Sequence, residues 1–196
     1  GYEARAIAAN AYAAGVEAIS SGENAIAWGV RANASGTSSM AIGTGSFSDQ
    51  NYSTAIGPNA SAEGNRSFAI GPDAFAKGEN AFAIGVGARA IGRDSFCIGD
   101  KCFDSGDSIE SLTEGYDVKS IGSNAAITFG AFAATYNSSS AVVIGTHAKG
   151  SDALNSTAIG RNAHTSSDSA MAYGTNSMVY SSSANSIAFG HSASAE

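Results

Sequence analysis

The chain has 196 residues, a formal net charge of −7 and only 14% charged residues, which is well below the share usual in soluble domains. Hydrophobic residues reach 43%, but alanine supplies much of that share, so few side chains are large enough to fill a deep core. Lysine and arginine total only 10, which argues against a nucleic-acid partner, and no apolar run approaches the roughly 20 residues of a membrane helix, so we expect no direct membrane insertion.

Glycines recur along the chain at a period of about fourteen residues. They stand at Gly29, Gly43, Gly57, Gly71, Gly85 and Gly99, and after one interruption at Gly130, Gly145, Gly160, Gly174 and Gly190. Further glycines lie halfway between the early ones, at Gly36, Gly64, Gly78 and Gly92. A fixed period of this kind is typical of solenoids, in which glycine supplies the positive φ of tight corners.

Short runs before each major glycine are predicted to be strands. Examples are residues 66–71, 80–85, 155–160 and 185–190, in which aromatic or β-branched residues alternate with alanine or serine. No window shows a sustained helical period. We therefore predict an all-β parallel solenoid with coils of fourteen residues, forming a single domain over residues 1–196.

Residues one and three before each glycine share one strand face, and residues two and four before it share the other. The second face is almost wholly alanine and serine, and we expect it to line a thin interior. The first face would then point outward and expose more apolar surface than soluble monomers tolerate, so we predict a homo-oligomer that buries it. The predicted interface residues are Trp28, Ile42, Ile56, Ile70, Ile84, Ile98, Phe129, Ile144, Ile159, Tyr173 and Phe189. The alternative is a monomer with the large residues inside the roll.

The strand after each glycine is mostly polar on its outer face, but aromatic residues interrupt it. Phe47, Phe75, Phe103, Phe132 and Tyr136 are the candidate ligand face. Exposed rings of this kind anchor partners, whereas scattered apolar surface residues are also ordinary.

Cys97 and Cys102 replace a facing pair of alanines, at the positions held by Ala83 and Ala88 one coil earlier. Two Cβ atoms that approach across a thin roll suit a disulfide, which we expect here. Two buried free thiols are the alternative. The following segment, about 100–121, is acidic and the least repetitive, and we predict a solvated excursion from the solenoid.

No catalytic, cofactor-binding or metal-binding motif stands out. His147, His164 and His191 fall at different positions in their coils, and no serine has a base placed beside it in the sequence. We therefore expect no enzyme activity and no cofactor. The words Ile56-Gly57-Pro58-Asn59-Ala60 look like the hexapeptide repeat of left-handed β-helix acyltransferases, but the fourteen-residue period argues against that family.

The phrase hydrophobic-Ala-Ile-Gly-x-x-Ala at fourteen-residue spacing resembles the head domain of YadA-like trimeric autotransporter adhesins. The resemblance covers roughly residues 4 to 195 and implies a left-handed parallel β-roll assembled as a homotrimer. It further implies a bacterial cell-surface adhesin, anchored in the outer membrane through regions absent from this fragment, whose partner is a host matrix protein or cell-surface receptor. A trimeric phage or virus fibre segment is the alternative.

Overall fold

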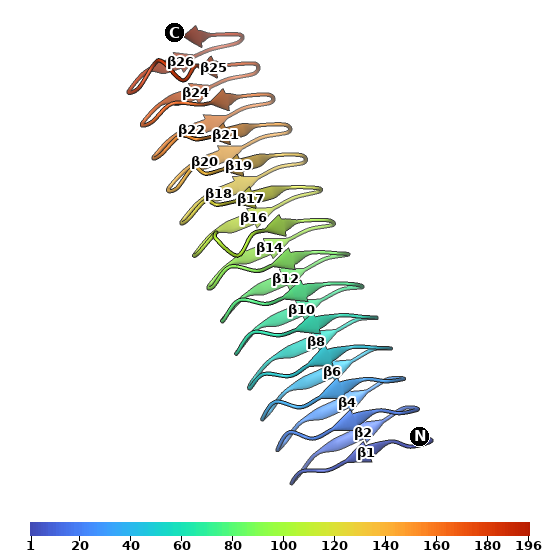
Figure 1. Ribbon diagram of the computed structural model, residues 1–196. Coiled ribbons are helices and arrows are strands. Elements are labelled where there is room, and N and C mark those ends of the chain that lie inside the picture. The colour runs from blue at the N-terminus through green and yellow to red at the C-terminus, as the bar shows by residue number, and fades with distance from the viewer. The chain divides into compact units, whose positions relative to one another are not determined.

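The computed structural model describes residues 1–196 and contains strands but no helix. The chain divides into two compact units, Gly1–Asp94 and Ser95–Glu196. Each unit is a parallel solenoid, in which every coil gives one strand to each of two sheets (Figure 1). We call these the even sheet and the odd sheet, after the strand numbers. The predicted all-β solenoid is confirmed, whereas the trimer stays a prediction. No helix is present that is long and apolar enough to cross a membrane.

In the first unit, neighbouring strands of a sheet are fourteen residues apart and in register, as Phe68, Ala69 and Ile70 are with Phe82, Ala83 and Ile84. The even sheet contains β2 (Tyr12–Ala14), β4 (Ile26–Trp28), β6 (Met40–Ile42), β8 (Thr54–Ile56), β10 (Phe68–Ile70) and β12 (Phe82–Ile84). The odd sheet contains β1 (Arg5–Ala6), β3 (Ile19–Ser20), β5 (Asn33–Ala34), β7 (Phe47–Ser48), β9 (Ser61–Ala62), β11 (Phe75–Ala76) and β13 (Arg89–Ala90).

The second unit repeats this pattern with some longer coils. Its even sheet contains β14 (Phe96–Ile98), β16 (Leu112–Glu114), β18 (Ile127–Phe129), β20 (Val142–Ile144), β22 (Thr157–Ile159), β24 (Met171–Tyr173) and β26 (Ile187–Phe189). Its odd sheet contains β15 (Phe103–Asp104), β17 (Lys119–Ile121), β19 (Ala134–Tyr136), β21 (Lys149–Ser151), β23 (His164–Thr165), β25 (Met178–Val179) and β27 (Ser194–Ala195).

Two kinds of glycine serve the corners for different reasons. Gly43, a major glycine, has φ of +134°, which L-residues with a Cβ rarely adopt. Gly78, a halfway glycine, lacks positive φ, but a Cβ there would lie 2.0 Å from the carbonyl oxygen of Gly92 in the next coil. The prediction that glycine provides positive φ therefore holds for the major glycines, while the halfway ones allow successive corners to pack closely.

The interior between the two sheets is thin and made of small side chains. In the first unit Ala27, Ala32 and Ala41 are fully buried, as the sequence predicts, and the alternative with large residues inside is excluded. The second unit admits larger residues where the facing position allows it. Val143 is fully buried against Gly150, where an added Cβ would lie 3.0 Å from Val143 Cγ2.

Residues 100–121 do not leave the solenoid, contrary to the predicted excursion. β15 pairs with β17, and β16 pairs with both β14 and β18, so the ladders continue through the segment. Gly115 is the missing major glycine, with φ of +143°. The added length lies in the turn at residues 105–111, between β15 and β16. Asp104, the last residue of β15, is an acidic residue of this segment that is fully buried, and it accepts a hydrogen bond from Ser111 Oγ.

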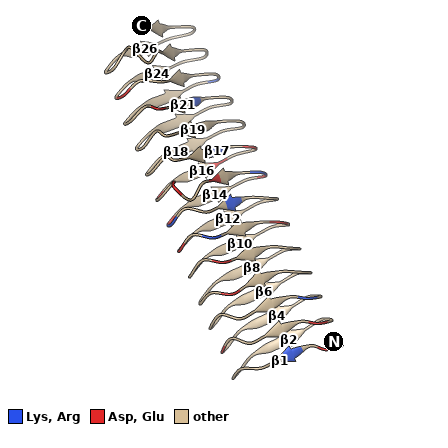
Figure 2. Ribbon diagram, viewed as in Figure 1, with Lys and Arg blue, Asp and Glu red and all other residues tan.

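Charged residues avoid the even sheet. Lysine, arginine, aspartate and glutamate lie mostly in turns and on odd strands, and the even strands of the first unit carry none of them (Figure 2). Glu114, the last residue of β16, is the one such residue on any even strand. The even sheet therefore presents an apolar outer face in each unit.

Candidate functional site

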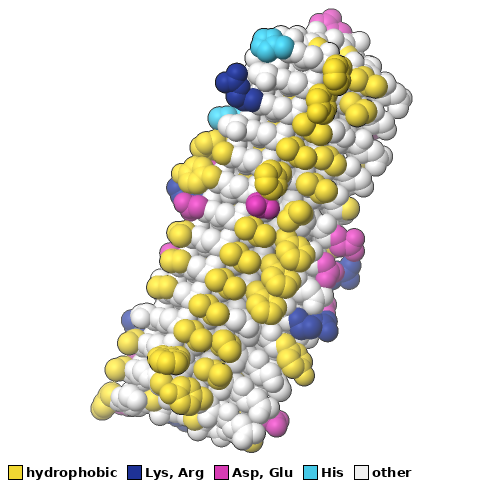
Figure 3. All heavy atoms as spheres, turned by 180° about the vertical axis from the view of Figure 1, so that it is seen from behind, with side chains coloured by type: hydrophobic (Ala, Val, Ile, Leu, Met, Phe, Trp, Pro, Cys, Tyr) yellow, Lys and Arg dark blue, Asp and Glu magenta, His cyan; other side chains and the backbone are white.

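In each unit the outer face of the even sheet carries a series of mostly large apolar side chains, which we call the apolar band. It consists of the first and last residues of the even strands from β4 onward, except the polar residues Thr54, Glu114 and Thr157, and Figure 3 shows hydrophobic side chains gathered on this face. Stacking in register brings like rings together: the ring centroids of Phe68 and Phe82 lie 4.8 Å apart, and those of Tyr173 and Phe189 lie 5.2 Å apart.

All eleven predicted interface residues lie in the apolar band, each as the last residue of its even strand. Nothing in the chain covers the most prominent of them, since Trp28 is 60% exposed and Phe189 is 75% exposed. Glu114 is not predicted from the sequence, and it holds the equivalent position in β16 between Ile98 and Phe129. Its coil was not recognised as a repeat, because Glu replaces the usual hydrophobic residue before the glycine.

The five predicted ligand-face residues do not form one cluster. Phe47 and Phe75 begin β7 and β11 in the first unit, and Ser61 lies between them in the ladder. In the second unit Phe103 begins β15, Tyr136 ends β19, and Phe132 lies in the turn before β19. The rings therefore occupy three different positions in the coil, and their role in ligand binding stays a prediction.

Phe132 instead belongs to a line of rings on successive turns of the second unit. Its ring stacks on that of His147 with centroids 5.0 Å apart, and it meets the ring of Tyr116 edge-on at 5.4 Å. Lys101 Nζ lies 5.7 Å from the centroid of Tyr116. We call Lys101, Tyr116, Phe132 and His147 the ring strip, and all four are exposed. The ring strip cannot be recognised from the sequence alone, because the length of each coil decides which turn residues become neighbours.

The neighbouring odd strands add two lysines beside the ring strip. Lys119, Ala134 and Lys149 are register partners on β17, β19 and β21. Lys149 Nζ lies 5.3 Å from the centroid of Tyr136, and Lys119 Nζ lies 3.6 Å from Asp117 Oδ1 in an exposed ion pair. Exposed pairs of this kind contribute little to stability.

His164, on β23, lies beside Ser151 and is the register partner of Lys149. Its Nε2 atom lies 3.2 Å from Ser151 Oγ, and burial followed by the positive charge of Lys149 lowers its pKa from 6.5. Neither Ser151 nor Lys149 supplies the carboxylate that would orient an imidazole as a general base for the serine. The structure contains no group of three or more histidine, cysteine, aspartate or glutamate residues that could hold a metal ion.

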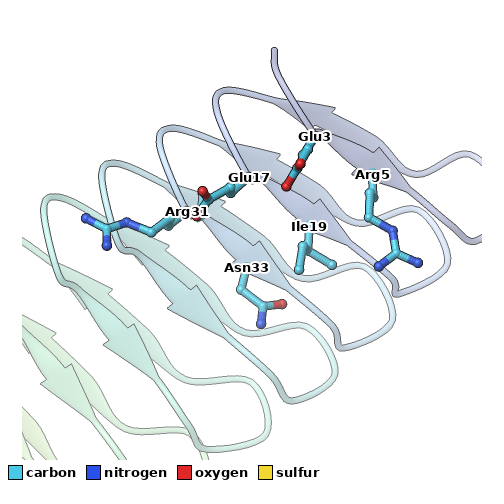
Figure 4. A pocket seen from close by; sticks show the side chains of 7 residues that line it. Glu3, Arg5, Glu17, Ile19, Arg31 and Asn33 are labelled. Carbon is cyan, nitrogen blue, oxygen red and sulfur yellow. The ribbon is translucent and has the colours of Figure 1, made fainter.

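The first unit has a hollow of about 410 Å³ at its N-terminal coils. Glu3, Glu17 and Arg31 reach it from successive turns, and Arg5, Ile19 and Asn33 reach it from β1, β3 and β5 (Figure 4). The structure forms no ion pair among its four charged residues. In these three coils, the residues two and four places after Gly1, Gly15 and Gly29 therefore face the same side of the coil.

Cys97 and Cys102 are joined by a disulfide and are fully buried, with Cα atoms 5.7 Å apart. Cys97 lies in the middle of β14, and Cys102 immediately precedes β15. The bridge therefore crosses the thin interior between the two sheets, just before the lengthened turn at residues 105–111.

Comparison with protein families adds one finding. The model of the YadA head domain repeat (2 copies) matches residues 6–32, 20–46, 48–74, 76–100 and 151–177, which together make up more than half of the chain. A comparison with curated proteins found no match. Residues 101–150 lie outside the matched segments, and they contain the lengthened turn at residues 105–111, the ring strip and both neighbouring lysines.

Proposed function

We propose, because this chain belongs to the YadA head domain repeat family, that it is the head of a surface-displayed homotrimeric adhesin. It attaches its bacterium to host cells or to the extracellular matrix and catalyses no reaction. YadA head repeats suggest an adhesin-type protein displayed at the cell surface. Trimer formation and the attachment role are the parts of this proposal that require experiment.

The apolar band is the observation that supports assembly. Soluble monomers rarely expose contiguous apolar patches larger than a few hundred Å². Here most even strands add two large outward apolar side chains to the outer face of their unit, and Trp28 and Phe189 remain largely exposed in the single chain. Because the face repeats coil by coil, three chains bury it most simply around an axis parallel to each solenoid.

Assembly also supports attachment by repeated contacts. Three identical chains present the same odd-sheet face three times, so a weak site on one chain gains avidity from the other two when a host surface carries many ligands. This mode of binding needs no deep pocket, in agreement with the thin interior of each unit.

Light scattering on the folded chain tests the assembly. We expect the mass of three chains for the wild type and a smaller mass for Ile84→Asp, since burying unpaired carboxylates at the interface is strongly unfavourable. Ser61→Asp is the matched control, because it adds the same charge to the outer face of the odd sheet. A monomeric wild type, or an intact Ile84→Asp trimer, would overturn the assignment of the interface.

Attachment is tested with the wild type and Ile84→Asp on host cells and on immobilised matrix proteins. We expect the wild type to bind and the dissociated variant to bind on the order of 10²-fold more weakly, through loss of avidity. Absence of binding by the wild type to every cell type and matrix protein would contradict the adhesin function.

A further inference from the structure

Glu114 places a carboxylate among the large side chains of the apolar band. Every other even strand from β4 onward ends on a large apolar residue, whereas β16 ends on Glu114. Its register partners are Ile98 on β14 and Phe129 on β18. The side chain is half-buried in the single chain, and it forms no ion pair with a lysine or arginine. Folding therefore leaves this carboxylate without a positive partner on an apolar face.

The elements around β16 offer Glu114 no free positive charge. On the outer face, β14 and β18 contribute only phenylalanine and isoleucine. Behind the sheet, Asp104 of β15 is buried in the thin interior. The turns that follow β14 and β16, together with β17, carry the titratable residues Asp100, Lys101, Tyr116, Asp117 and Lys119. Lys101 Nζ lies 5.7 Å from the ring centroid of Tyr116. Lys119 is paired with Asp117.

A second copy of the chain brings no positive charge to this face either. No even strand from β2 to β26 contains lysine or arginine. In the proposed trimer the axis is parallel to each solenoid, so the three Glu114 side chains lie at the same height along it. Each carboxylate then meets apolar side chains and the carboxylates of the other two copies. Both surroundings disfavour the ionised form, because burial removes water from the charge and like charges repel.

We propose that assembly of the head is coupled to proton uptake by Glu114, so that the trimer tightens as the pH falls. This inference rests on the proposed function and adds regulation to its interface. The assembled head binds more protons than three separate chains, because a neutral carboxyl group is buried at a lower cost than a carboxylate. The association constant therefore rises on acidification, by up to about tenfold per pH unit for each carboxyl group that gains a proton. Attachment by repeated contacts is then strongest in an acidic medium.

Sedimentation equilibrium of the full chain measures the association constant from about pH 5 to about pH 8, where an exposed glutamate is mostly ionised. For the wild type we expect a rise of about tenfold or more toward the acidic end. Glu114→Gln keeps the shape of the side chain without its charge, so we expect it to lose this rise and to associate at high pH as tightly as the acidified wild type.

Glu110→Gln is the matched control, because Glu110 is exposed in the turn before β16 of the same coil. We expect this variant to follow the wild type at every pH. Comparison of the variants also separates Glu114 from other groups that titrate in this range, such as His164. Parallel curves for the wild type and Glu114→Gln, or the same loss of the rise in Glu110→Gln, would overturn the proposal.

Infrared spectroscopy reports the protonation state of the carboxyl group directly. In the difference spectrum between the assembled wild type and assembled Glu114→Gln at neutral pH, we expect the carbonyl band of a protonated carboxyl group. A carboxylate band in its place would contradict proton uptake. A bound cation is the competing way to neutralise three carboxylates, so the wild type is also treated with a chelator. A trimer that dissociates on this treatment would overturn the proposal, whereas one that persists supports it.

The same measurements distinguish failure of this inference from failure of the proposed assembly. A wild type that sediments as a monomer at every pH would contradict the trimer itself, and proton-coupled assembly with it. A stable wild-type trimer whose association constant differs from that of Glu114→Gln by the same factor at every pH would overturn the proton uptake alone and leave the trimer in place.

Discussion

The backbone conformation of a corner restricts which residue types can occupy it, and side-chain contacts restrict the choice further. Asparagine and aspartate tolerate the left-handed region because their short polar side chains bond locally, and most corners of this chain use polar residues there. Stacked corners then gain a second contact: Asn59 Nδ2 donates to Asp73 Oδ1 at 3.2 Å, and Asn162 Nδ2 donates to Asn176 Oδ1 at 2.9 Å. Phe132 and His147 give up this amide ladder for a stack of rings.

His164 makes stability depend on pH. Its pKa is lowered from 6.5 by burial and by Lys149, so the unfolded chain binds more protons than the folded one between the lowered pKa and 6.5. The free energy of unfolding therefore falls as the pH decreases through 6.5, and this contribution is fully lost below the lowered pKa. We expect the Tm of the wild type to fall more than that of His164→Gln on acidification.

The Tm of both proteins is measured by thermal unfolding at several pH values, with His191→Gln as the control because that histidine is exposed. Lys149→Gln should raise the pKa of His164, which an NMR titration of the ring protons reports. If the Tm of the wild type and that of His164→Gln changed in parallel with pH, His164 would not contribute to the pH dependence of stability.

At the scale of the coil, the two sheets constrain each other through a very thin interior. A larger residue on one strand needs a smaller one opposite, as with Val143 and Gly150, or a polar pair that bonds across, as with the hydroxyls of Thr128 and Thr135. The disulfide of Cys97 and Cys102 is a third solution, and it fixes β14 to the corner that precedes β15.

The double variant Cys97→Ala with Cys102→Ala tests the contribution of this bridge. Alanines occupy both equivalent positions one coil earlier, so we expect the fold to persist and the free energy of unfolding to fall by about 2 kcal/mol, since the bridge closes a short loop. Denaturant unfolding measures the difference. The wild type under reducing conditions should approach the variant, and equal stability of the variant and the oxidised wild type would show that the bridge contributes nothing.

The repeat predicts most of the fold because one physical pattern recurs in most coils. It places the alanines inside and the large side chains outside, and it pairs the two cysteines. It fails at residues 100–121, where Glu114 and Val118 replace the usual hydrophobic residue and alanine around Gly115, so the coil loses its recognisable sequence while keeping its backbone. The ring strip stays hidden for a related reason, since Tyr116 and Phe132 stand at different distances after their glycines.

At the scale of the whole molecule, the apolar band is the surface that no other part of the chain covers. Each unit satisfies its own backbone through its two sheets, so the interactions still missing are those that would cover the outer face of the even sheet. Glu114 is the one charged residue on that face. If the band is an interface between chains, this carboxylate lowers the stability of the assembly, because its removal from water is poorly compensated by Ile98 and Phe129.

Glu114→Ile should therefore stabilise the assembled protein, raising its Tm by about 2–4 °C for each kcal/mol gained. Scanning calorimetry measures the change, and light scattering shows that the mass is the same. Glu23→Ile is the control, because Glu23 is exposed in a turn outside both sheets. A lower Tm for Glu114→Ile, or an equal rise in the control, would argue that Glu114 lies outside the interface.

In-register stacking has a genetic consequence. Where each coil bonds to its neighbours through the same atoms, as Phe68 to Ile70 do with the strands on either side, a block of fourteen codons can be duplicated or deleted and the new neighbours still match. Insertions of one or two residues have no such freedom inside a strand and must be absorbed in a turn, as at residues 105–111. Lineages of this protein should therefore differ in whole coils, with smaller length changes confined to turns.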